Sequence, residues 1–202
     1  MIKYFTLFFI IFLLTVCSEE VPDFENGDII FQTSQSSQSE AIQLASKSKY
    51  SHMGIIYEEN EDYYVYEAVQ PVGITKLGEW IKKGKGGHFV LKRIRNAKRK
   101  LTPEVLRKMK EVGESFKGKN YDSYFEWSDE KLYCSELVWK IYKRAVNIEI
   151  GELQKFKDFD LSHPTVQSKM KERYGDNLPM DEFVISPSQI FNSNQLVEIY
   201  SN

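Results

Sequence analysis

One stretch decides the fold of this chain: Leu132-Tyr133-Cys134-Ser135-Glu136-Leu137-Val138-Trp139. It places a single cysteine where a polar segment changes into an apolar pattern with helical spacing. Apolar residues follow at three- and four-residue steps, which is the spacing of one buried helix face, at Val138, Ile141, Tyr142 and Ala145. The pattern predicts a helix with Cys134 in its first turn. There the unpaired N–H groups and the positive end of the helix dipole favour the nucleophilic thiolate. Alternatively, Cys134 is a small buried hydrophobic residue, the commoner role of a free cysteine.

The N-terminus of the chain has the pattern of a targeting signal. The chain has 202 residues, enough for one domain with a sizeable core. Residues 4–16 form a nearly unbroken apolar run after Lys3. This run is shorter than the about 20 residues of a membrane span, but it matches the apolar core of a signal peptide. We therefore expect a lipoprotein-type signal peptide at 1–16, an acidic tether at 17–26 and one folded domain at 27–202.

The end of the apolar run, Leu14-Thr15-Val16-Cys17, resembles a bacterial lipoprotein box, in which the cysteine is lipidated. Val16 departs from that pattern, which prefers a small residue before the cysteine. Ordinary signal cleavage and an uncleaved anchor therefore remain alternatives. Lipidation of Cys17 predicts an exported protein anchored to a membrane of the bacterial cell envelope. It also leaves Cys134 as a lone thiol, which is a candidate reactive group in an exported protein.

Charge does not indicate a nucleic-acid partner. The formal net charge is −2, with 27 basic and 29 acidic side chains. The lysine- and arginine-rich run at 82–100 is either a solvated face or a surface for phosphate or other anionic groups. We see no internal repeat.

The remaining patterns predict an α+β domain. Short apolar segments bounded by turn residues predict strands at 27–32, 50–57, 63–68, 72–75, 88–94 and 196–200. Helical spacing and cap residues predict helices at 40–49, 77–83, 102–118, from 134 onward, at 166–174 and at 186–191. The expected caps are Ser39, Thr102 and Ser186, and Gly118 is the expected stop of the third helix. Segment 156–180 is a long excursion, either a substrate-covering flap or poorly ordered.

The predicted strands 50–57 and 63–68 form a hairpin whose register decides whether His52 meets Glu67. A two-residue turn at Asn60-Glu61 places Glu67 diagonal to His52 on the same face of the sheet. A four-residue turn places the two residues directly opposite, whereas three- or five-residue loops place them on opposite faces. Two of these registers make a histidine–glutamate pair.

A cysteine nucleophile needs a base and a polar group that orients the base. His88 and His163 have no acidic neighbour placed by strand pairing, whereas His52 has Glu67. Alternatively, His52 is a satisfied histidine inside a sheet and Glu67 a salt-bridged surface residue. No cluster of histidine, cysteine or aspartate has metal-ligand spacing, so we expect neither a metal nor another cofactor.

Six short motifs occur in the order and context of the YiiX/YaeF family, the permuted papain-like amidases related to the NlpC superfamily. The motifs are Gly27-Asp28-Ile29-Ile30-Phe31, Ser51-His52-Met53-Gly54-Ile55, Tyr66-Glu67-Ala68, Tyr121-Asp122, Tyr133-Cys134-Ser135-Glu136-Leu137-Val138 and Ser186-Pro187-Ser188. The resemblance covers about residues 27–200. Each motif is weak alone, but six in order are fairly specific. In that family the histidine strand precedes the cysteine helix, the reverse of papain.

The resemblance implies a circularly permuted papain-like (NlpC-type) fold, with an antiparallel sheet or small barrel packed against helices and the nucleophile at a helix N-terminus. It makes Cys134 the nucleophile, His52 the base and Glu67 the residue that orients the imidazole. The Cys134 backbone N–H would form part of the oxyanion hole, with Tyr133 or Tyr50 as candidate side-chain donors.

The implied function is that of a cysteine peptidase or amidase, cleaving peptide or isopeptide bonds through a thioester. The export signal points to cell-wall peptides as substrates. One alternative is a lipid-directed acyltransferase or esterase of the same fold, which an apolar, lipid-sized groove would favour. The other is a non-enzymatic surface-binding lipoprotein, although a binding protein has no need of cysteine, histidine and glutamate together.

Overall fold

The domain is built on one six-stranded antiparallel sheet with the order β10-β5-β1-β2-β3-β4. The computed structural model describes residues 22–202, so the expected signal peptide, Cys17 and much of the tether lie outside the described residues. The strands are β1 (Ile29–Ser34), β2 (His52–Glu59), β3 (Asp62–Glu67), β4 (Gly73–Lys76), β5 (Gly84–Ile94) and β10 (Leu196–Ser201). This sheet confirms the expected α+β class. Its order leaves β10 and β4 as edges, so it is a sheet and not a closed barrel.

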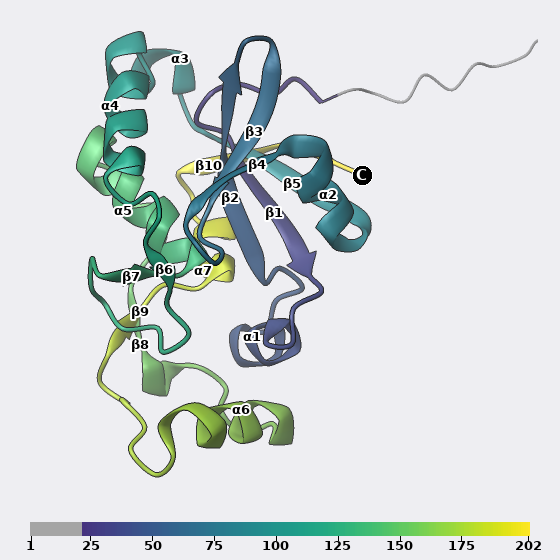
Figure 1. Cartoon of the computed structure of the whole chain (residues 1–202), viewed down its shortest axis with the longest axis vertical. Coiled ribbons are helices and arrows are strands. Elements are labelled where there is room, and N and C mark those ends of the chain that lie inside the picture. The colour runs from purple at the N-terminus through teal and green to yellow at the C-terminus, as the bar shows by residue number, and fades with distance from the viewer. Residues whose placement is uncertain (1–21) are drawn as a thin grey trace, which may run out of the picture.

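Helices cover both faces of the sheet (Figure 1). On one face lie α4 (Pro103–Glu114) and α5 (Cys134–Val146), whose apolar residues pack against alternate residues of β1 and β2 such as Phe31 and Ile55. On the other face, α2 (Leu77–Lys83) packs Trp80 against Ile30, Ile56 and Val65. The alternation of side chains along each strand therefore makes two separate apolar layers.

A third apolar cluster lies beyond one end of the sheet. It joins α1 (Ser39–Ser46) to α6 (Pro164–Tyr174) through Ala41, Val166 and Met170. The chain reaches it through β8 (Gln154–Lys155), the 3-10 helix η1 (Phe156–Asp158) and β9 (Phe183–Val184). Segment 156–180 is thus packed on α1. Its helix begins at Pro164, two residues earlier than expected, because the His163 side chain accepts a hydrogen bond from the Thr165 N–H and caps it.

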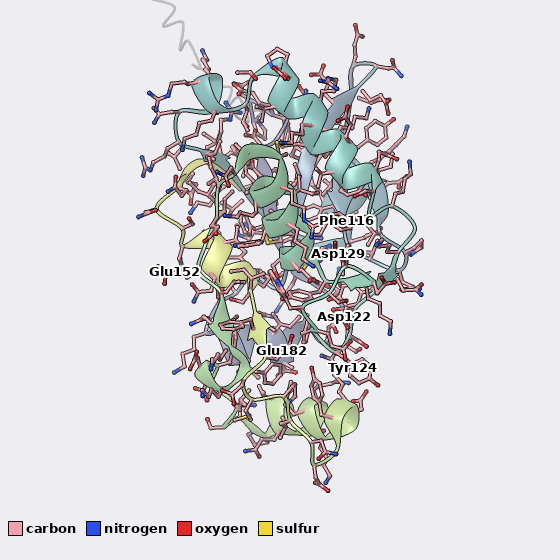
Figure 2. All side chains as sticks on the ribbon, turned by 90° about the vertical axis from the view of Figure 1, so that its left-hand side faces the viewer. Phe116, Asp122, Tyr124, Asp129, Glu152 and Glu182 are labelled. Atoms are coloured by element: carbon pink, nitrogen blue, oxygen red, sulfur yellow. The ribbon has the colours of Figure 1, made fainter. Side chains whose placement is uncertain are left out.

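The elements before α5 complete the scaffold. A short helix α3 (Ala97–Lys100) precedes α4, and two short strands, β6 (Asn120–Tyr121) and β7 (Lys131–Leu132), form a parallel pair that leads into α5. The loop between them, which carries Asp122 and Asp129, lies beside α5 in Figure 2. The last helix, α7 (Pro187–Phe191), contacts α5 and is capped by Ser186 as expected.

Two further expectations about helix ends are wrong for identifiable reasons. Ser39 does not cap α1: the N-cap residue is Gln38, because the Ser39 hydroxyl pairs with the Ser51 hydroxyl at 2.6 Å. α4 is capped by Thr102 as expected but ends at Glu114, not at Gly118. Gly118 instead turns the chain with a φ of +80°, and its N–H bonds to the Val72 carbonyl.

Candidate active site

Cys134 is the first residue of α5, the position that the sequence predicts. Tyr133 is the N-cap in an extended conformation, and its backbone N–H donates to the Glu136 carboxylate. The helix is held in place by its buried face, since Leu137, Val138 and Ile141 are fully buried against the sheet. The thiol is only 3 % exposed and is a free cysteine at the positive end of the helix dipole.

The β2–β3 hairpin has the two-residue turn, because Glu59 pairs with Asp62 across Asn60 and Glu61. Both turn residues have positive φ, as tight hairpin turns require. This register places Glu67 diagonal to His52, and His52 Nε2 lies 2.5 Å from Glu67 Oε2. The histidine–glutamate pair that the sequence predicts is therefore formed.

Three donors hold the Glu67 carboxylate. Besides His52, Trp80 Nε1 donates to Oε2 at 2.9 Å, and Thr75 Oγ1 donates to Oε1 at 2.5 Å. Burial alone would raise the pKa of Glu67, but the bonds from His52 and Thr75 lower it below its ordinary value. The group that orients the imidazole is thus an ionised carboxylate.

His52 joins this carboxylate to the thiol. Burial favours neutral imidazole, but side-chain hydrogen bonds with Cys134 and Glu67 outweigh it and raise the pKa of His52 to about 10. Because Nε2 faces Glu67, Nδ1 is the ring nitrogen left for the sulfur. The thiol and the imidazole thus act on each other although their elements belong to different layers, and the raised pKa favours the charged imidazole at neutral pH.

Of the other residues considered in the sequence analysis, Tyr133 lies next to Cys134, whereas Tyr50 and His88 lie away from it. Tyr133 is buried next to Cys134, and its hydroxyl accepts a hydrogen bond from the Ile185 N–H at 3.1 Å. Tyr50 stacks on Phe191 and lines neither of the cavities described below. His88 hydrogen-bonds the carbonyl of Asn202, far along the chain from the site.

Tyr121, to which the sequence assigned no role, lies beside the thiol. Its hydroxyl accepts a hydrogen bond from Gln38 Nε2 at 2.8 Å, and Gln38 Oε1 accepts one from Arg173 at 2.7 Å. Burial, and next the charge of Cys134, raise the pKa of Tyr121 well above its ordinary value, so the phenol stays protonated. Tyr121-Asp122 is one of the six motifs, but the sequence of two residues does not show where the Tyr121 hydroxyl points. The role of Tyr121 could therefore not be predicted.

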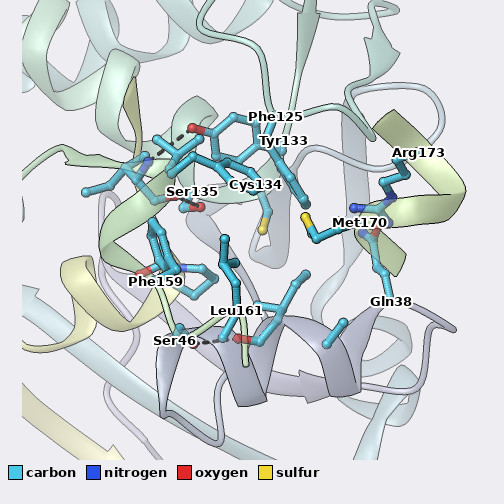
Figure 3. A pocket seen from close by; sticks show the side chains of 18 of the residues that line it. Gln38, Ser46, Phe125, Tyr133, Cys134, Ser135, Phe159, Leu161, Met170 and Arg173 are labelled. Atoms are coloured by element: carbon cyan, nitrogen blue, oxygen red, sulfur yellow. Dashed lines mark hydrogen bonds between the residues drawn. The ribbon is translucent and has the colours of Figure 1, made fainter. Parts of the chain in front are cut away.

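Two cavities meet at this site, each with an empty volume of about 670 Å³ that includes open solvent. One is lined by Cys134 and by apolar side chains of α1, α6 and η1, with the sulfur pointing into it (Figure 3). The other is lined by His52, Glu67 and polar side chains of β1 and its following loop. Gln38 and Tyr121 line both, so they form the boundary between the two cavities.

Two absences are clear within residues 22–202. No group of three or more His, Cys, Asp or Glu side chains there is arranged to hold a metal ion. Over the same residues, no helix combines the length and the apolarity that crossing a membrane requires.

Comparison with known proteins shows which family the chain resembles. A family model described as permuted papain-like amidase enzyme, YaeF/YiiX, C92 family, matches residues 23–200. The uncharacterized protein YiiX of Escherichia coli K12 is 47% identical over 175 residues, which cover 87% of this chain and 85% of YiiX. A crystal structure described as metalloprotein YiiX from Escherichia coli O157:H7 has a TM-score of 0.84 at 47% identity, covering 88% of this chain and 97% of that chain. These matches confirm the permuted papain-like fold expected from the sequence.

Proposed function

Because this chain belongs to the YaeF/YiiX family of permuted papain-like amidases, we propose that it cleaves amide bonds through a thioester on Cys134. In this proposal His52 is the acid–base residue and Glu67 orients the imidazole. One observation carries it: His52 Nε2 lies 2.5 Å from the buried Glu67 carboxylate, and Cys134 and Glu67 together raise the pKa of His52 to about 10. A charged imidazole beside a thiolate is the resting state of a cysteine nucleophile.

The reaction proceeds in two halves. The Cys134 thiolate attacks the amide carbonyl carbon, and the carbonyl π electrons move to oxygen. His52 then gives its Nδ1 proton to the amide nitrogen, the carbon–nitrogen bond breaks and the amine leaves, so that a thioester remains. In the second half, His52 takes a proton from water, the hydroxide attacks the thioester, and the carboxylic acid leaves as Cys134 regains its electron pair.

The tetrahedral oxyanion needs donors that are already in place. The backbone N–H of Cys134, at the start of α5, is one. Tyr121 fits best as the side-chain donor, because Gln38 donates to its oxygen and thereby directs its own proton elsewhere. Tyr133 and Tyr50 fit less well, since Tyr121 lines both cavities, whereas Tyr133 lines only the cavity at Cys134 and Tyr50 lines neither.

The test is labelling of Cys134 by iodoacetamide at mildly acidic pH, followed by intact mass. We expect fast labelling of the wild type, at least tenfold slower labelling of His52→Ala, and none of Cys134→Ala. His88→Ala is the matched control, because His88 contacts the C-terminal residue and not the thiol. Labelling that is unchanged in His52→Ala would favour a non-enzymatic binding protein.

A second candidate function is acyl transfer, in which an alcohol or amine resolves the thioester in place of water. The apolar cavity at Cys134 favours it, since such a cavity suits a lipid acyl chain. The same cavity weighs against cell-wall peptides, the substrate class that export alone would suggest. Product analysis with and without an added alcohol separates transfer from hydrolysis.

We also propose that the protein is exported and anchored to a membrane through lipidated Cys17. The apolar run at 4–16 and the box that ends in Cys17 support this location. The lipid, and not the folded domain, would hold the protein at the membrane. In cell fractionation, Cys17→Ala should move the protein from the membrane to the soluble fraction. An intact mass that retains an unmodified Met1 would contradict the anchor.

A further inference from the structure

We propose that Arg173, at the end of α6, controls the side-chain donor of the oxyanion through Gln38. In this proposal Arg173 and Gln38 are positioning residues, because they act on the reaction only through the direction in which the Tyr121 hydroxyl donates. The inference rests on the proposed function, since it concerns the oxyanion that forms when Cys134 attacks a carbonyl group.

The backbone holds Tyr121 beside the nucleophile. Tyr121 of β6 pairs with Leu132 of β7, two residues before Cys134. The Tyr121 backbone N–H donates to Gln70 Oε1 at 2.7 Å. Its side chain lines the same cavity as Cys134. A hydroxyl fixed at this place stabilises the oxyanion only if its proton points toward it.

A row of three polar side chains decides the direction of that proton. Arg173 Nη2 lies 2.7 Å from Gln38 Oε1, and Gln38 Nε2 lies 2.8 Å from the Tyr121 hydroxyl oxygen. A guanidinium can only donate, so the Gln38 amide must turn its oxygen to Arg173 and its N–H to Tyr121. The Tyr121 oxygen then accepts, and its own proton points away from Gln38.

Without Arg173 the Gln38 amide would have no fixed direction. The oxygen and the nitrogen of a glutamine amide have nearly the same shape, and a half-turn of the group exchanges them. In the turned state Gln38 Oε1 would accept the Tyr121 proton, and the oxyanion would lose its side-chain donor. Arg173 therefore acts on the oxyanion across two hydrogen bonds.

This chain of hydrogen bonds crosses from α6 to α1. Gln38 is the N-cap residue of α1, and Arg173 lies in the last turn of α6, with its guanidinium 5.2 Å from the centre of the Phe125 ring. Figure 3 shows the Arg173 and Gln38 side chains pointing toward each other. The third apolar cluster holds the two helices together. The oxyanion donor is thus complete only when α6 is packed on α1.

The experiment compares two reactions of Cys134 in the whole chain under single-turnover conditions. Acylation by p-nitrophenyl acetate forms a tetrahedral oxyanion and is followed by p-nitrophenolate release. Alkylation by iodoacetamide displaces iodide at a saturated carbon, forms no oxyanion, and is followed by the mass of the peptide that holds Cys134. The ratio of the two rate constants therefore reports the oxyanion donor and cancels changes in the thiolate.

We expect Gln38→Glu to lower this ratio by about tenfold or more. A carboxylate at this position still pairs with Arg173, but it accepts the Tyr121 proton and so removes the donor. Gln167→Glu is the matched control, because Gln167 is an exposed residue of α6 that lies outside the chain of hydrogen bonds. It should leave the ratio unchanged.

A double variant separates an effect through Tyr121 from a direct effect of the new charge. Tyr121→Phe alone should lower the same ratio, and adding Gln38→Glu to it should lower the ratio no further. A further loss in the double variant, or an unchanged ratio in Gln38→Glu alone, would overturn the inference.

Variants of Arg173 test the far end of the chain. Arg173→Met should lower the ratio by about three- to tenfold, the effect of one neutral hydrogen bond. Arg173→Lys keeps a group that can only donate and should recover most of the ratio. Lys171→Met, in the same turn of α6, removes a cation that pairs with Asp176 and should change nothing. A loss in Arg173→Lys as large as in Arg173→Met would mean that Arg173 acts only through packing.

Failure of the proposed function gives a different result. If p-nitrophenolate release by the wild type is the same in Cys134→Ala, or if His52→Ala leaves both reactions unchanged, the chain has no activated nucleophile and the proposed function fails together with this inference. If both reactions depend on Cys134 and His52 but the ratio depends on neither Gln38 nor Arg173, only this inference fails.

Discussion

The charge on the imidazole of His52 depends on Cys134 and also on Glu67, a neighbour that takes part in no reacting bond. Glu67 is buried, holds His52 Nε2, and is itself held by Trp80 and Thr75. Because the folded protein raises the pKa of His52 from 6.5 to about 10, the imidazolium stabilises the fold. This contribution is fully present below about pH 6.5 and is lost as pH rises through about 10.

We predict that Glu67→Gln moves the alkaline limb of kcat/KM to lower pH. Glutamine can still accept from His52 and Trp80, but it has no charge, so the pKa of His52 should fall by about 1 to 3 units. The measurement is the pH–rate profile of wild type and variant. The control Glu111→Gln removes an exposed carboxylate that pairs with Arg107 and should leave the limb in place. An unmoved limb in Glu67→Gln would show that Glu67 does not control the imidazole.

Tyr121→Phe tests the oxyanion donor. Loss of one preorganised donor typically lowers kcat by about 10² to 10³, and we expect that loss with little change in KM. Tyr50→Phe is the matched control, because Tyr50 packs on Phe191 and reaches neither cavity. If Tyr121→Phe keeps full activity and Tyr133→Phe loses it, the donor is Tyr133.

The helices and strands that are marked by a pattern of neighbouring residues were predicted well. The apolar spacing after Cys134 predicted α5, and Thr102-Pro103 predicted the start of α4. The polar turn at 58–62 left two registers that pair His52 with Glu67, and the structure has the one with the two-residue turn at Asn60-Glu61. Ser39 failed as a cap because its hydroxyl bonds Ser51, a partner twelve residues away that no local pattern reveals.

The close approach of β2 and β3 depends on Gly54. A Cβ at this position would lie 2.4 Å from Val65 Cγ1 and 2.7 Å from the Tyr66 carbonyl oxygen. We predict that Gly54→Ala separates the strands, moves Glu67 away from His52 and lowers activity, and costs about 1 to 3 kcal/mol of stability. Urea unfolding and kcat/KM measure the two effects. Gly78→Ala in α2 meets nothing within 4 Å, so it should be neutral or stabilising.

A buried ion pair within α5 joins the catalytic helix to the loop before it. Lys140 Nζ lies 2.7 Å from Glu136 Oε1 and 2.9 Å from Asp129 Oδ1. Burial raises the pKa of Glu136 to about 8 although Lys140 opposes it. Glu136 is therefore poorly stabilised as an anion, and it depends on Lys140 wherever it is charged.

We predict that Lys140→Met lowers the free energy of unfolding by about 3 to 5 kcal/mol at about pH 9.5, above the pKa of Glu136, because it leaves a buried carboxylate unpaired. The loss should be smaller at pH 5, where Glu136 can be protonated in the folded protein. Urea unfolding at both pH values measures this, and the double variant Glu136→Gln/Lys140→Met should recover part of the loss. Equal losses at both pH values would contradict the role given to Glu136.

At the scale of the whole molecule, the site lies where three apolar clusters meet. Cys134 belongs to the layer under α5, His52 stacks on Trp80 of the opposite layer, and the apolar cavity lined by Cys134 opens between α1 and α6. The pairing of Cys134 with His52 stays a prediction, which the family resemblance makes because it relates the two motifs. The cavity was not predictable, because it joins segments more than a hundred residues apart whose apolar residues could equally have packed into the main core.

Because the third apolar cluster is separate from the other two, we expect the helices that form it to unfold locally. α1 and α6 share a small apolar cluster that is separate from the large core under α5. The free energy of their local unfolding should therefore be lower than that of the sheet. In native-state hydrogen exchange, amides of α6 should exchange faster than those of β2 and α5. N-decyl iodoacetamide bound to Cys134 should slow the exchange of α1 and α6, whereas the N-methyl reagent should not. If the amides of α6 and α5 are equally protected from exchange before labelling, α1 and α6 unfold only together with the whole domain.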